Sequence, residues 1–112
     1  MTLTELVQKA HGTALEKGWW DGMSPADIER AIPEKLCLIH SEVSEALESF
    51  RNREADWILP NGKPVGLSSE LADVVIRIAD LCGAIGINLE DAVMLKMAYN
   101  ETRSARHGGK RC

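Results

Sequence analysis

Apolar residues recur at helical spacing along most of the chain. This periodicity predicts helices over about residues 2–17, 25–31, 33–52, 67–85 and 88–103. Thr2 and Glu5 form a capping box at the start of the first helix, and Ser24 followed by Pro25 is typical of a helix start. Pro33 interrupts the short second helix and starts the next, longer one.

Turn-forming residues separate the predicted helices. Residues 53–66 contain two prolines, an Asn-Gly pair and a further glycine, a combination that predicts a loop. Ser68 or Ser69 caps the helix that follows, and Gly86 ends it. Asn88 caps the last helix.

The helix over residues 67–85 is apolar around most of its circumference, so it must be covered on most sides. The other helices of a 112-residue chain cannot do this alone. We therefore predict a homo-oligomer, a dimer or a tetramer, in which this helix packs against its symmetry mate. The predicted fold class is all-α: a single four-helix-bundle-like domain over residues 1–112, with its core completed by homo-oligomerisation.

Charge and composition restrict the location and the partners of the protein. The net charge is −4, with five basic residues and one acidic residue in 96–112, so residues 1–95 carry −8. The negative net charge argues against binding along a nucleic-acid backbone. An acidic body with a basic tail suits an anionic ligand that arrives with a cation. Cys37, Cys82 and Cys112 match no zinc pattern, and as free cysteines they fit a reducing compartment. Without a membrane-spanning run or a signal peptide, a cytoplasmic location is expected.

Two pairs of acidic residues border apolar stripes. Glu42 and Glu45 are three residues apart on one predicted helix, and Glu70 and Asp73 are three apart on the next. Where the helices pack, like charges at roughly 6 Å repel by about 3 kcal/mol at an effective dielectric constant of about 20. A divalent cation removes this cost, and oxygen ligands favour Mg²⁺ or Mn²⁺. Arg77 is expected to pair structurally with Asp73, one turn before it.

Two further groups suit a ligand that carries phosphates. Lys96, Asn100 and Arg103 lie at i, i+4 and i+7, so they form one stripe of donors for phosphate oxygens. Trp19 and Trp20 stand in a predicted loop, where an exposed indole can stack on a nucleobase. The chain has no P-loop motif.

In this order, the motifs resemble those of the MazG-like all-α nucleoside triphosphate pyrophosphohydrolases. The resemblance covers residues 33–111, and the matching segments are LIHSEVSEALE (38–48), ELADVV (70–75), GAIGINLEDA (83–92) and KMAYNETR (96–103). It implies hydrolysis of a nucleoside triphosphate, standard, non-standard or deoxy, to the monophosphate and pyrophosphate, with Mg²⁺ or Mn²⁺ as cofactor. Many family members carry a further acidic residue just before the first pair, where this chain has His40 and Ser41.

The resemblance also implies a role for each candidate residue. The implied metal ligands are Glu42, Glu45, Glu70 and Asp73; the implied phosphate ligands are Lys96, Asn100 and Arg103; and the implied base contacts are Trp19 and Trp20. Phosphoryl transfer needs positioning and charge neutralisation, and Glu42 or Glu45 could take the proton of the attacking water.

Two other readings remain open from the sequence. The first keeps the fold and changes the substrate, to dUTP, dCTP or phosphoribosyl-ATP. The second is a helical oligomerisation module that senses nucleotides without hydrolysing them.

Overall fold

The computed structural model describes residues 1–103. Its elements, in chain order, are α1 (Leu3–Glu16), α2 (Pro25–Arg51), β1 (Trp57–Ile58), β2 (Pro64–Val65), α3 (Leu67–Ile85) and α4 (Leu89–Glu101). This mostly helical architecture confirms the predicted all-α class. The remaining basic residues of the C-terminal segment, Arg106, Lys110 and Arg111, lie outside the described residues together with Cys112.

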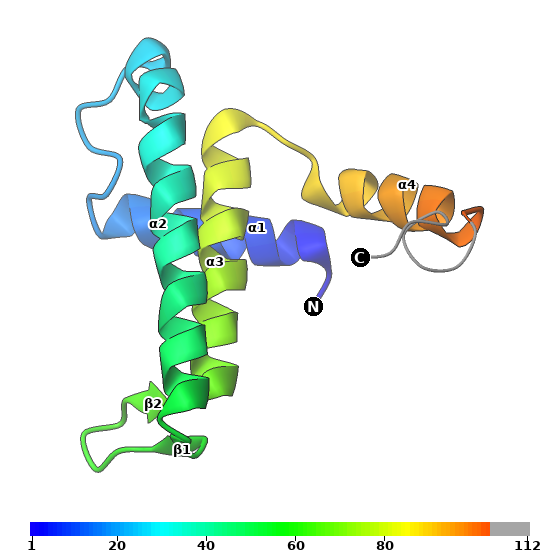
Figure 1. The fold of residues 1–112 in the computed structure, drawn as a ribbon. Coiled ribbons are helices and arrows are strands. Elements are labelled where there is room, and N and C mark those ends of the chain that lie inside the picture. The colour runs from blue at the N-terminus through cyan, green and yellow to red at the C-terminus, as the bar shows by residue number, and fades with distance from the viewer. Residues whose placement is uncertain (104–112) are drawn as a thin grey trace.

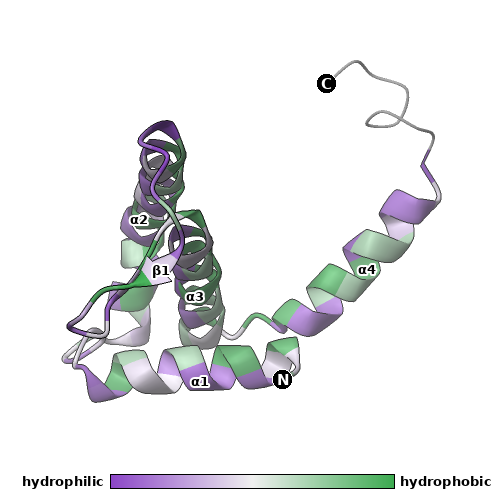
Figure 2. Cartoon of the chain, turned by 90° about the horizontal axis from the view of Figure 1, so that it is seen from below, coloured by the Kyte–Doolittle hydropathy of each residue, from purple (hydrophilic) through white to green (hydrophobic). Residues whose placement is uncertain are grey.

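The helices α2 and α3 form the long central pair, and α1 lies across it (Figure 1). Helix α3 makes the main packing interfaces, with α2 on one side and α1 on the other. Helix α4 has only a small contact with α1 and contains no buried residue. It points away from the other helices (Figure 2), so a four-helix bundle does not form within one chain.

The predicted break at Pro33 is wrong, because α2 is one continuous helix that passes through this proline. Proline lacks the N–H that would bond to the carbonyl four residues earlier, here that of Glu29. Both residues are exposed, so water can bond to that carbonyl. Ile32 and Ile39, on either side of the proline, pack against the same core, which holds the two halves of α2 in line.

The segment predicted as a loop between α2 and α3 instead contains a short antiparallel hairpin, in which Trp57 pairs with Val65. Its turn is built as its sequence suggests: the Gly62 N–H donates to the Leu59 carbonyl, and Gly62 has a φ of 89°. Pro60 at the second turn position presets the backbone for this geometry. The turn residues therefore lie in a turn, as the sequence predicts. The two paired strands on either side of it were not predicted from the sequence.

The start of α3 also differs from prediction, since its N-cap is Gly66 rather than Ser68 or Ser69. The hairpin supplies the missing acceptors. The carboxylate of Asp56 accepts from the backbone N–H and the hydroxyl of Ser68, and Glu54 Oε1 accepts from the Gly66 N–H at 2.8 Å. These bonds from Ser68 lower the pKa of Asp56. Acidic groups at a helix N-terminus are also favoured by the helix dipole.

The other predicted helix ends are confirmed. Thr2 and Glu5 form the capping box of α1, and Ser24 caps α2. Gly86 ends α3 in the left-handed conformation, and Asn88 caps α4 through the N–H of Asp91.

The core is small and lies where α1, α3 and the loop after α1 meet. Ala14, Trp20 and Leu81 are buried there, with partly buried side chains of α2 and α3 packed around them. Many large apolar side chains of the central pair remain about half exposed: Leu36, Val43, Leu47, Leu71, Val75 and Ile76. Phe50 of α2 and Met94, Leu95 and Met97 of α4 are exposed still further. A single chain therefore leaves an unusually large apolar surface in contact with water.

The two cysteines in the described part of the chain are free. Cys82 is buried, which raises the pKa of its thiol, whereas Cys37 is exposed and does not fill an apolar interface within the chain. None of the helices within residues 1–103 combines the length and the apolar character needed to cross a bilayer.

Two helical glycines provide a matched test of the α1–α3 crossing. A Cβ at Gly83 would lie 2.5 Å from Cβ of His11, whereas a Cβ at Gly12 would meet no atom within 4 Å. We expect Gly83→Ala to lower the free energy of unfolding by about 1–3 kcal/mol through overpacking. Gly12→Ala should raise it by about 0.5–1 kcal/mol, because alanine is the better helix former. Urea denaturation at one fixed protein concentration measures both; equal stabilisation by the two variants would contradict the close crossing.

Candidate metal and substrate site

Three of the four predicted carboxylates converge between the central helices. Glu42 and Glu45 come from α2, and Glu70 comes from the first turn of α3. One carboxylate oxygen of each residue lies within 4.8 Å of the others. Glu42 is buried, Glu70 half-buried and Glu45 exposed, so the cluster is open to solvent on one side.

Asp73 lies outside this compact group, yet its charge reaches the group. Partial burial raises the pKa of Glu70, and the neighbouring carboxylates of Glu45, Asp73, Glu42 and Glu54 raise it further, in that order. A carboxyl group surrounded by like charges resists ionisation. The cluster is therefore electrostatically strained as it stands.

Arg77 pairs with Glu42, not with Asp73 as the sequence suggested. Its Nε donates to Oε1 of Glu42 at 2.7 Å, across the interface between α3 and α2. This bond compensates the most deeply buried charge of the cluster and fixes the orientation of its carboxylate.

The donor set fits a hard divalent cation. Carboxylate oxygens within 4.8 Å of one another can approach a common ion with small side-chain adjustments. A cation would also relieve the repulsion that raises the Glu70 pKa. Oxygen-only ligation suits Mg²⁺ and Mn²⁺ alike, so the geometry does not select one of them.

The predicted phosphate-binding stripe lies on α4 and just beyond its end. Lys96 and Arg103 both lie against the ring of Tyr99, with Nζ of Lys96 5.3 Å and Cζ of Arg103 5.8 Å from the ring centroid. Asn100 follows Tyr99 in the last turn of α4. Within one chain, however, α4 projects away from the central pair (Figure 2), so the stripe does not lie beside the carboxylates.

The two predicted base contacts have different environments. Trp19 is 55% exposed, whereas Trp20 is buried at 6% and belongs to the core. Nε1 of Trp20 donates to both oxygens of Asp80, at 3.0 and 3.2 Å. Nδ1 of His11 lies 2.8 Å from the same carboxylate. Nζ of Lys35 lies 4.6 Å from the centroid of the Trp20 ring, which completes the support of this indole.

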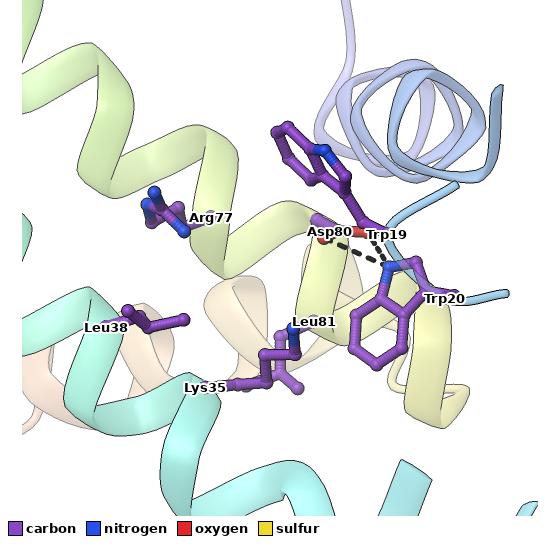
Figure 3. Close-up of a pocket in the computed structure, with 7 residues that line it drawn as sticks. All are labelled: Trp19, Trp20, Lys35, Leu38, Arg77, Asp80 and Leu81. Carbon is purple, nitrogen blue, oxygen red and sulfur yellow. Dashed lines mark hydrogen bonds between the residues drawn. The ribbon is translucent and has the colours of Figure 1, made fainter. Parts of the chain in front are cut away.

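Both tryptophans line a pocket of about 130 Å³ between the loop and the central helices. Figure 3 shows its other walls: Lys35 and Leu38 from α2, and Arg77, Asp80 and Leu81 from α3. Because Arg77 both lines the pocket and bonds to Glu42, the pocket and the carboxylate cluster adjoin.

Lys35, Asp80 and His11 were not predicted as site residues, although the spacing contained a signal. Lys35 lies seven residues before Glu42, and Asp80 lies seven after Asp73, so each continues the face of its helix that carries the acids. His11 had no such signal, because its partner Asp80 is 69 positions away.

Comparisons of this chain with models of protein families, with curated proteins and with solved structures found no match.

The repulsion within the carboxylate cluster predicts how the melting temperature of the metal-free protein depends on Glu70. Because the Glu70 pKa is higher in the folded than in the unfolded chain, ionisation of Glu70 costs stability as pH rises above its ordinary value of 4.5. We expect Glu70→Gln to raise the melting temperature at neutral pH, by an amount that shrinks as the pH approaches that value. Scanning calorimetry in EDTA measures it, with Glu34→Gln, an exposed α2 residue, as the control. A neutral-pH melting temperature lower than that of the wild type would contradict the assignment.

Proposed function

We propose that this protein hydrolyses a nucleoside triphosphate to the monophosphate and pyrophosphate with the help of Mg²⁺, as the MazG-like resemblance implies. The observation that supports the proposal best is the convergence of Glu42, Glu45 and Glu70 from two helices, with oxygens within 4.8 Å of one another. Such a cluster costs stability unless a cation and a ligand use it. A purely structural role does not explain that cost.

Each acidic residue has a distinct part in the proposed reaction. Glu42, oriented by Arg77, and Glu70 hold the cation with Glu45, and Asp73, whose charge acts on Glu70, is the fourth proposed ligand. When bound, Mg²⁺ would neutralise phosphate charge and lower the pKa of a coordinated water. Glu45 is the better general base of the two candidates, because it is exposed, whereas Glu42 is held by Arg77.

The proposed phosphate ligands on α4 need a second copy of the chain. Lys96, Asn100 and Arg103 lie apart from the carboxylates of their own chain, and the apolar side chains of α2, α3 and α4 are left exposed. A homo-oligomer in which α4 of one copy packs against the central pair of another covers this apolar surface. It also brings a cationic stripe to an anionic cluster.

The reaction is tested with a panel of ribo- and deoxynucleoside triphosphates, with and without Mg²⁺, and with the products identified. We expect release of pyrophosphate rather than orthophosphate. Glu45→Gln and Asp73→Asn should each lower kcat by roughly 10²–10⁴-fold, since they remove a metal ligand or the base. Glu48→Gln, three residues further along α2, serves as the matched control and should keep wild-type turnover. Wild-type rates in the Glu45 variant, or tight nucleotide binding without any product, would refute the proposal.

Sharing of the site between copies has its own test. Glu45→Gln and Lys96→Ala lie on the two halves of the proposed shared site, so each variant should be nearly inactive alone. After mixing and subunit exchange, a dimer should recover about a quarter of wild-type activity, because half of the dimers are mixed and each has one intact site. Size-exclusion chromatography with light scattering supplies the oligomeric state. No recovery between exchanging subunits, or a monomeric mass at micromolar concentration, would contradict the shared site.

A further inference from the structure

We infer that the pocket beside the carboxylate cluster is a base subsite that favours a pyrimidine over a purine. The inference rests on the proposed function, because it takes the triphosphate to lie at the carboxylates. It adds what the motifs do not provide, the class of nucleotide.

The position of the pocket follows from Arg77. This side chain lines the pocket and at the same time donates to Glu42 of the cluster. Leu38, on the opposite wall, lies one helical turn before Glu42 on α2. A nucleotide whose phosphates lie at the cluster therefore has this pocket next to it as a place for its base.

The size of the pocket limits the base. Its volume is about 130 Å³. An apolar cavity of about 150 Å³ in another protein holds benzene, a single six-membered ring. One pyrimidine ring fills a space of that size, whereas the fused second ring of a purine would extend beyond the walls of the pocket.

The walls that set this size are held from several sides. Trp20 and Leu81 are buried at 6% and 8% exposure. The Trp20 indole is bonded to Asp80, which His11 also engages, and Lys35 lies over the face of the ring. Moving the indole wall outward would break this network, so we expect this side of the pocket to keep its shape when a ligand binds.

The polar groups of the pocket match the edge of a pyrimidine. Asp80 offers acceptor oxygens, whereas Lys35 and Arg77 offer donors. Cytosine and uracil each present one donor group and two acceptor groups on the edge away from the sugar bond. Trp19, exposed at the rim, is available to stack on the face of the ring.

Binding and turnover are measured separately. Isothermal titration with CMP, UMP, AMP and GMP in Mg²⁺ reports on the pocket, and kcat/KM for CTP, UTP, ATP and GTP reports on the reaction. We expect a pyrimidine preference of about tenfold to a hundredfold in both. Selective pyrimidine binding without hydrolysis would refute the proposed function and keep the subsite. Hydrolysis with equal or greater use of purines would refute the subsite and keep the function.

Variants of the walls locate the effect. Leu38→Ala enlarges the pocket at a half-buried position, so we expect the pyrimidine preference to narrow by about tenfold through a gain with purines. Trp19→Ala should weaken pyrimidine binding by roughly tenfold. Trp57→Ala, an equally exposed indole on the hairpin at the far end of α2, is the control and should change neither quantity. An unchanged preference in folded Leu38→Ala, checked by circular dichroism, would exclude this pocket as the base subsite.

Discussion

The repulsion among acidic groups between α2 and α3 is the constraint around which the candidate site is organised. Glu42, Glu45 and Glu70 lie close enough to share an ion, and Asp73 adds to the field that raises the Glu70 pKa. Within residues 1–103, the direct ion pair to this group is the bond from Arg77 to Glu42. Uncompensated charge of this kind stores free energy that a cation and a phosphate ligand can release.

A second network, centred on Asp80, supports the side of the site away from the acids. Its carboxylate joins His11 of α1, Trp20 of the following loop and α3, so three segments of the chain depend on one acceptor. This network fixes the indole wall of the pocket, while Arg77, one turn earlier on α3, connects that pocket to the acids. One face of α3 therefore carries both Arg77, which compensates the charge of Glu42, and Asp80, which holds the indole wall of the pocket.

Helix α4 leaves a large apolar surface exposed to water. It contains no buried residue, and the apolar side chains of α2 and α3 are half exposed as well. Apolar area of this extent is normally removed from water by association. In the proposed association, α4 of one copy lies on the central pair of another, so that hydrophobic and electrostatic complementarity would favour the same arrangement.

The sequence by itself determined the local features, because helix periodicity, capping residues and turn residues act over a few positions. Thr2, Ser24, Gly86 and Asn88 function at helix ends as predicted, and Glu42, Glu45 and Glu70 converge as their spacing indicated. Contacts between residues distant in the sequence decided the course of α2, the partner of Arg77 and the pocket. Packing on both sides kept α2 continuous through Pro33, and Glu42 rather than Asp73 became the partner of Arg77. The pocket, too, exists only because segments distant in sequence meet, and no local pattern encodes their distance in space.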